Sequence, residues 1–245
     1  MDILKIVVLN NSGNVGKSLI CDRLLQPRIP NSSIIKIETI NADDSDDEKL
    51  SAKDIAEVQN QIDMTDVCII DVGASNIEVF RNSLSKMSDT IEDIDIFIIP
   101  TVPKAKQLAD TVNTVLSLDL LGVPSDKIKI IFNMYDPDFS LERQYRLLFD
   151  DDSLSSLSLD KPENQFIIPN TEVFDIAIDA GLDYKKIIND NNDYRALIRA
   201  TQNKDERKEL SVRRTIKSLF KSFDSELDIC FNKLAKSCNW DFDKK

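Results

Sequence analysis

Residues 11–18 of the chain have the sequence Asn-Ser-Gly-Asn-Val-Gly-Lys-Ser. A largely apolar run at residues 3–9 precedes this stretch and predicts a buried strand. The apolar positions of the following segment, residues 19–25, recur at helical spacing. Loops that bind phosphate groups typically lie between a strand and a helix. They contain small residues and end in the triplet Gly-Lys-Ser at the start of the helix. The stretch therefore predicts a nucleotide site at the end of the first strand.

The loop residues are suited to this chemistry. Gly13 and Gly16 permit close backbone approach and positive φ, and N–H groups at a helix start can point at phosphate oxygens. Lys17 can reach the β- and γ-phosphates, and the Ser18 hydroxyl can bind Mg²⁺. The usual pattern has glycine where Asn11 stands, but asparagine tolerates left-handed backbone. The alternative is an ordinary helix N-terminus with an exposed lysine. The candidate nucleotide contacts are Ser12, Gly13, Asn14, Val15, Gly16, Lys17 and Ser18.

Composition narrows the range of functions. The 245 residues carry a net charge of −12, so the whole surface will not attract nucleic acid or anionic lipid. Histidine is absent, which excludes histidine-based general bases, triads and zinc sites. The four cysteines form no Cys-x-x-Cys pair, and no apolar run approaches the ~20 residues of a membrane span. We expect a cytoplasmic protein with reduced thiols.

The rest of the chain alternates strands with helices. Apolar runs at residues 33–40, 67–72, 94–100, 128–136 and 166–170 predict further strands, separated by helical segments. This alternation predicts an α/β fold with a mostly parallel central sheet and helices on both faces. We expect a nucleotide-binding domain at residues 1–181 and a helical C-terminal extension, packed on it, at residues 182–245.

Two acidic residues are candidates for the metal and the attacking water. Asp71 ends an apolar strand and lies two residues before Gly73, where phosphate-loop NTPases place an acid that holds Mg²⁺. The alternative for Asp71 is a helix cap. Asp43 begins an acidic run after the second strand. One interpretation is a switch loop whose first acid, Asp43 or Asp44, faces the nucleotide, with Asp43 as a candidate catalytic residue. The other is a solvated loop.

Polar residues at the later strand ends are candidates for contact with the base. Asn133 lies at the carboxyl end of a predicted strand, where ligands of open α/β sheets bind, and can hydrogen-bond a purine ring. The alternative is that Asn133 starts a turn. Asp136 follows at the spacing of the guanine-reading Asn-Lys-x-Asp motif, although the lysine is missing.

The last third of the chain carries a long apolar stripe at helical spacing, from Val212 to Leu234. Its first part, residues 204–221, carries seven Lys or Arg residues and three acids. The simplest interpretation is a helix packed on the domain with a solvated basic face. The alternatives are non-specific DNA contact, a partner surface or a membrane-surface helix.

The loop at residues 12–18 resembles the deviant phosphate loop of ParA/MinD-type ATPases. Residues 69–75, 100–103 and 132–134 follow in the order of that family. The combination Ser-Gly-Asn-Val-Gly-Lys, Glu-x-Ile-Asn-Ala-Asp, Asp-Val-Gly-Ala-Ser-Asn and Pro-Thr-Val-Pro is similar to StbB-type plasmid stability proteins. This resemblance, over roughly residues 1–180, implies a cytoplasmic Mg²⁺-ATP-dependent protein of a plasmid stability or conjugation operon. It also implies a DNA-binding adaptor, a nucleotide-dependent homodimer, contact of Asn133 with adenine and a base-lining backbone near Pro169.

Two positions depart from the family pattern. Ser12 stands in place of a signature lysine that reaches across the dimer. The family also has an Asp-x-Asp after the second strand, whose second Asp orients the attacking water; this chain lacks that pattern, and Asp43 is a candidate for the role. We therefore expect weak ATPase activity. The alternatives are a degenerate nucleotide-binding module with little hydrolysis, a GTP-binding protein, or a small-molecule kinase or ligase on the same fold. Direct DNA or membrane contact is expected only through the basic C-terminal helix.

Overall fold

The computed structural model describes residues 3–37, 52–86 and 88–242. The acidic run and the candidate Asp43 lie outside the described residues. Within the described ranges, no helix has the length and apolar character that a membrane span requires.

The strands form a single six-stranded sheet in the order β2-β3-β1-β4-β5-β6, and every neighbouring pair is parallel. The carboxyl ends of all six strands therefore lie along one edge of the sheet, which is where ligands of such sheets bind. The strands are β1 (Leu4–Val8), β2 (Ser33–Ile37), β3 (Val67–Val72), β4 (Ile96–Thr101), β5 (Ile128–Tyr135) and β6 (Phe166–Pro169).

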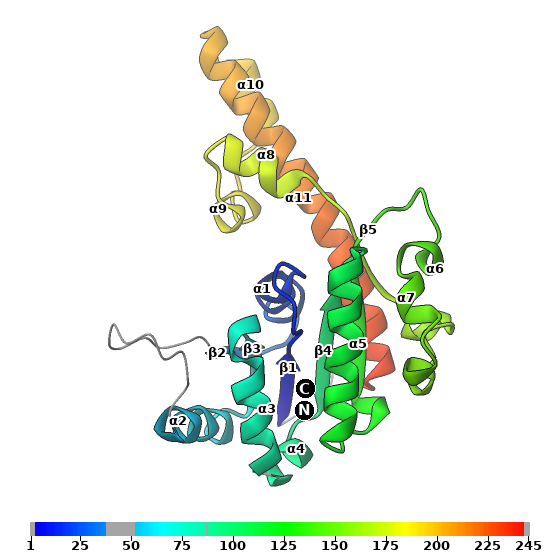
Figure 1. The fold of residues 1–245 in the computed structure, drawn as a ribbon. Helices are drawn as coiled ribbons and strands as arrows, with labels where there is room; N and C mark the ends of the chain where they lie inside the picture. Colours follow the sequence, from blue (N-terminus) through cyan, green and yellow to red (C-terminus); the bar gives the residue numbers. More distant parts are fainter. Residues whose placement is uncertain (1–2, 38–51, 87, 243–245) are drawn as a thin grey trace. The chain divides into compact units, whose positions relative to one another are not determined.

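Helices connect the strands and follow the last of them (Figure 1). The α-helices are α1 (Lys17–Leu19), α2 (Ala52–Asp63), α3 (Ile77–Lys86), α4 (Ser88–Asp93), α5 (Ala105–Leu120), α6 (Leu141–Gln144), α7 (Arg146–Phe149), α8 (Val173–Asp179), α9 (Tyr184–Ile188), α10 (Tyr194–Ala200) and α11 (Lys204–Ser237). The helix after the loop is short, because α1 widens at once into a π-helix at Ile20–Leu25. The predicted α/β fold with a parallel sheet is confirmed.

Strand side chains alternate between the two faces of the sheet. On one face, Val7, Phe97 and Ile99 belong to a single apolar cluster with residues of α3 and α5. On the other face, the π-helix contacts β3, and its Cys21 and Leu24 are buried. Both faces are covered, which explains why β1, β3 and β4 are almost continuously apolar.

The contacts divide the chain into two units. The first unit comprises residues 1–169 and 230–245, and the second comprises residues 170–229. Within the second unit, Phe174 of α8 packs edge-on against Phe220 and Phe223 of α11. The expected domain boundary at 181/182 stays a prediction. Residues 230–245 return to the first unit, where the Lys233 ammonium donates to the Gln165 carbonyl at 2.8 Å.

Candidate functional site

The loop between β1 and α1 has the backbone of an anion cradle. Asn14 has a φ of 56° and Gly16 a φ of 92°, so the chain turns twice through the left-handed region before the helix begins. Among the residues that the structure describes, none accepts a hydrogen bond from the backbone N–H groups of Gly13 to Ser18. Such a series of unpaired N–H groups at a helix start is suited to phosphate oxygens.

Lys17 lies in the same loop and is largely buried. Its ammonium group donates to the Ser12 carbonyl at 2.8 Å and to the Asn10 carbonyl at 3.3 Å. Burial lowers the pKa of Lys17, and the nearby charge of Asp71 opposes this shift. The lysine is thus a partly desolvated cation held by neutral carbonyls, and an anionic ligand would stabilise it more strongly than these carbonyls do.

Ser18 and Asp71, the two residues expected to bind Mg²⁺, lie next to each other and near Lys17. The Ser18 hydroxyl donates to Oδ2 of Asp71 at 3.3 Å. Burial raises the pKa of the Asp71 carboxyl, while the Ser18 hydrogen bond and the charge of Lys17 lower it. A hydroxyl oxygen and a carboxylate oxygen at this separation fit the hard ligands that Mg²⁺ prefers.

The donor set also indicates how such a metal would be held. In the described part of the chain, no group of three His, Cys, Asp or Glu side chains could hold a metal ion by itself. Mg²⁺ is commonly held by one or two protein ligands together with phosphate oxygens and water. Ser18 and Asp71 therefore suit a metal that arrives with a nucleotide.

Ser12 is buried, and its backbone is hydrogen-bonded within the loop. Its exposed fraction is 3%, its N–H donates to Oδ1 of Asn10 at 2.8 Å, and its carbonyl accepts from Lys17. Asn10, which is fully buried, also donates to the Pro100 carbonyl at 2.8 Å. Sequence reasoning missed Asn10, although an asparagine that ends an apolar strand directly before the loop is a signal that could have found it.

Asn133 supports the loop from β5. Its side-chain amide donates to the Val15 carbonyl at 3.0 Å, and its own carbonyl accepts from the buried Tyr145 hydroxyl at 2.6 Å. A Cβ atom at Gly16 would lie 2.3 Å from Nδ2 of Asn133. The predicted contact of Asn133 with a purine stays a prediction, and this amide nitrogen already has a loop partner.

The other predicted base contacts lie nearby at the strand ends. Oδ1 of Asp136 accepts from the Asp138 N–H at 3.0 Å, so this carboxylate closes a local turn. Pro169 ends β6 and pairs with Tyr135 beside an irregularity in the β5–β6 register. Both residues lie at the same edge of the sheet as the loop.

The turn after Asp71 is joined to the end of β2. The Ile37 carbonyl accepts from the Gly73 N–H at 3.2 Å and from the side-chain amide of Asn76 at 3.1 Å. Asn76 is buried and was not predicted as a functional residue. Its position links the segment that follows Asp71 to the last described residue before the acidic run.

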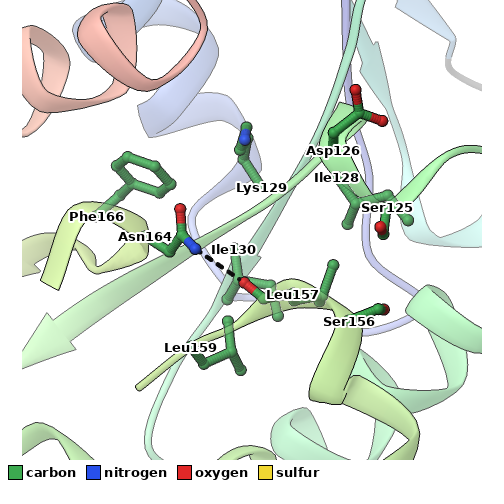
Figure 2. A pocket seen from close by; sticks show the side chains of 10 residues that line it. All are labelled: Ser125, Asp126, Ile128, Lys129, Ile130, Ser156, Leu157, Leu159, Asn164 and Phe166. Carbon is green, nitrogen blue, oxygen red and sulfur yellow. Dashed lines mark hydrogen bonds between the residues drawn. The ribbon is translucent and has the colours of Figure 1, made fainter. Parts of the chain in front are cut away.

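A separate cavity lies at the opposite edge of the sheet, near the amino ends of β5 and β6 (Figure 2). It has a volume of about 220 Å³, and Ile130, Leu157 and Phe166 are among its apolar lining residues. Asn164 also lines the cavity, and its side-chain amide donates to the Leu157 carbonyl at 3.1 Å. Because the loop lies at the carboxyl edge, this cavity does not belong to the candidate nucleotide site.

The geometry defines a class of site: a parallel α/β sheet with a loop after its first strand whose N–H groups, lysine and serine–aspartate pair can together receive phosphate groups and Mg²⁺. No protein-family model matches the chain, and a search of curated proteins also finds no match.

Three solved structures have a similar arrangement. One is described as a plasmid partition protein of Borrelia burgdorferi bound to AMPPNP, with 14% identity, a TM-score of 0.46 and coverage of 88% of this chain and 98% of that chain. The MinD cell division protein of Aquifex aeolicus has 14% identity, a TM-score of 0.45 and the same coverage. The ATP complex of a single-residue variant of McdA from Cyanothece has 13% identity, a TM-score of 0.42 and coverage of 93% and 97%. At these values the likeness assigns no function to the chain.

Proposed function

We propose that the chain is a Mg²⁺-ATP-dependent switch protein of the ParA/MinD kind, related to StbB-type plasmid stability proteins. It acts in plasmid stability, partition or positioning, and in conjugation, together with a DNA-binding adaptor. The observation that carries the proposal is the Ser18–Asp71 pair beside Lys17, in a loop whose N–H groups have no partner among the described residues. The four sequence motifs shared with StbB-type proteins support the finer assignment.

In this proposal, each part of the loop has a separate task. The N–H groups from Gly13 to Ser18 hold phosphate oxygens, and Lys17 leaves its carbonyl partners for the β- and γ-phosphates. Ser18 and Asp71 hold Mg²⁺, which neutralises charge on the phosphates when it is bound. Asp43 remains the candidate for orienting the attacking water.

Slow hydrolysis is part of the proposal. The side chain at position 12 is a short serine with an exposed fraction of 3%, which cannot reach the phosphates of a second copy. A nucleotide-dependent homodimer would therefore lack a cation supplied across the dimer, and cations of this kind accelerate phosphoryl transfer. We propose that the bound state persists and acts as the signal.

ATP is favoured over GTP in this proposal. Guanine recognition by the Asn-Lys-x-Asp pattern would use the Asp136 carboxylate, of which Oδ1 already accepts from the Asp138 N–H, and Met134 stands where the pattern has lysine. A GTP-binding protein therefore stands as the second candidate.

The helical unit offers a surface for DNA. Between residues 195 and 221 the chain carries nine basic and three acidic residues in a protein of net charge −12. On α11, Lys204, Lys208, Arg214 and Lys221 are exposed, and the apolar side, with Ile216 and Phe220, is buried. A membrane-surface helix would need that apolar side for lipid, so the phosphate backbone of DNA is the better fit.

The first test is the binding of fluorescent ATP and GTP analogues with and without Mg²⁺, with the molecular mass recorded in the same samples. We expect Mg²⁺-dependent ATP binding, weakened more than about tenfold by Lys17→Ala, because the charge-assisted bonds to phosphate are lost. Lys161→Ala, which removes an exposed lysine elsewhere in the first unit, is the matched control.

Each outcome distinguishes the hypotheses. Preference for GTP would support the second candidate. Failure of both nucleotides to bind, with Lys17→Ala unchanged in all assays, would leave only a degenerate binding module. Transfer of phosphate to a small acceptor would indicate a kinase on the same fold.

A further inference from the structure

Three hydroxyl residues lie along the buried side of α5. Thr111 and Thr114 have exposed fractions of 0%, and Ser117 has 9%. Each hydroxyl donates to the carbonyl four residues earlier, at 2.7, 2.7 and 2.6 Å. Each hydroxyl thus uses its single proton in a hydrogen bond to the backbone of its own helix. The oxygen lone pairs remain free to accept hydrogen bonds from other segments.

The Thr114 hydroxyl oxygen accepts a hydrogen bond from the phosphate loop. Its Oγ1 accepts from the Asn11 N–H at 3.1 Å, across 103 positions of sequence. Asn11 is the loop residue at which the usual pattern has glycine. The Thr114 hydroxyl therefore holds the N–H of the first loop residue on the side of α5.

Thr111 is connected to the loop through Asn10. The Asn10 amide donates to Oγ1 of Thr111 at 2.9 Å and to the Pro100 carbonyl at 2.8 Å, and its Oδ1 accepts from Ser12. The Thr111 hydroxyl is also hydrogen-bonded to that of Thr101, at 2.9 Å. Because the Gln107 carbonyl can only accept, the Thr111 proton goes there and the Thr101 hydroxyl supplies the proton between the two threonines.

This arrangement divides the N–H groups of the loop into two sets. Those of Asn11 and Ser12 are bound to Thr114 and Asn10, and those from Gly13 onward have no partner among the described residues. Asn10, Ser12, Thr111 and Thr114 are buried, and buried polar groups of this kind are rarely left unpaired. The position of α5 therefore decides where the loop begins and which N–H groups face a ligand.

We propose that Thr111 and Thr114 are positioning residues for the phosphate loop, and that they couple the position of α5 to nucleotide affinity. The proposal rests on the proposed function, because it names how the same nucleotide site is regulated. Thermodynamic reciprocity requires that bound nucleotide also stabilises this position of α5.

Thr114→Val and Thr111→Val test the proposal, because valine keeps the side-chain shape and removes the acceptor. We expect each change to weaken binding of AMPPNP with Mg²⁺ by about tenfold, the scale of one lost buried hydrogen bond. Thr114→Ser restores the hydroxyl and should restore the affinity. Ser117→Ala removes the third hydroxyl, which has no described bond to the loop, and should leave AMPPNP affinity unchanged.

Amide hydrogen exchange provides a readout that general destabilisation would not imitate. Thr114→Val should speed exchange at Asn11 relative to the sheet amides, and AMPPNP should slow exchange in α5 of the wild type. If Thr114→Val does not fold, Thr111→Val carries the same test through Asn10.

The proposal and the function on which it rests can fail separately. Wild-type AMPPNP affinity in both valine variants, or equal losses in Ser117→Ala, would overturn the positioning role alone. Absence of nucleotide binding by the wild type would overturn the proposed function, and the coupling to affinity with it.

Discussion

The candidate site contains a buried cation, Lys17, next to a largely buried anion, Asp71. Burial lowers the pKa of Lys17 and raises the pKa of Asp71, although each charge favours the ionised form of the other. Burial is the largest cause in both residues, so the mutual attraction does not offset the lost hydration. Bound Mg²⁺ and phosphate would therefore stabilise the charged forms of Lys17 and Asp71 relative to the ligand-free site.

Asp71→Asn tests this balance in the free protein. The raised pKa means that the native state binds the proton of Asp71 more tightly than the unfolded state does, even with Lys17 nearby. The ionised carboxylate therefore costs stability at neutral pH. This cost is lost as pH falls through the raised pKa and is absent below the ordinary value of 3.8. We expect Asp71→Asn to be more stable than the wild type at pH 7, with the difference shrinking in acid.

Urea unfolding from pH 7 to pH 4 measures this effect. The same variant should lose the Mg²⁺ dependence of nucleotide binding, because an amide is a poor Mg²⁺ ligand compared with a carboxylate. Ser18→Ala is the control, since it removes the other proposed metal ligand without removing a charge. Lower stability of Asp71→Asn at pH 7 would show that attraction to Lys17 outweighs burial.

At the scale of elements, the loop is held between α5 on one side and β5 on the other. Thr114 and Asn133 bond the loop across 103 and 118 positions of sequence. The positive φ of Gly16 brings its Cα against the Asn133 amide, where a Cβ atom would be 2.3 Å from nitrogen. Backbone conformation and tertiary contact thus require glycine at the same position.

Gly16→Ala should therefore destabilise the protein. Left-handed backbone costs a residue with a Cβ atom roughly 1–2 kcal/mol, and the clash with Asn133 adds to it. Gly13→Ala is a matched control, because a Cβ there meets nothing within 4 Å and Gly13 does not have a positive φ. We expect Gly13→Ala to stay within about 0.5 kcal/mol of the wild type in urea unfolding. Equal losses in the two variants would contradict the specific strain at Gly16.

The elements themselves could be predicted from local patterns. Apolar runs and the Gly-Lys-Ser triplet predict the strands and the loop because their signals lie within a few adjacent residues. The parts that sequence reasoning missed are contacts between distant segments. Nothing in the local sequence distinguishes Thr114, which bonds the loop, from Ser117, which does not. The place of α8 in the second unit depends likewise on distant residues, since Phe174 of α8 packs on Phe220 and Phe223.

At the scale of the whole molecule, charge is distributed unevenly along the chain. Residues 195–221 carry a local charge of +6 in a protein of net charge −12. Some of these cations have partners within their unit, such as Arg213 with Glu209 at 3.1 Å. Arg214 and Lys221 are exposed, seven positions apart on α11, so they lie on the same side of the helix. An acidic protein that contacts DNA would do so through such a restricted surface.

Exchange of Arg214 and Lys221 for Gln tests this surface. If both contact phosphates, log affinity for non-specific duplex DNA should depend less steeply on log salt, with the slope reduced by about 1.8, because each contact contributes about 0.9. The paired control exchanges Lys106 and Lys161, two exposed lysines of the first unit, for Gln and should leave the slope unchanged. Fluorescence anisotropy between 50 and 200 mM salt measures both (roughly the range over which such contacts weaken). Equal slopes in all proteins would mean that Arg214 and Lys221 do not contact DNA phosphates.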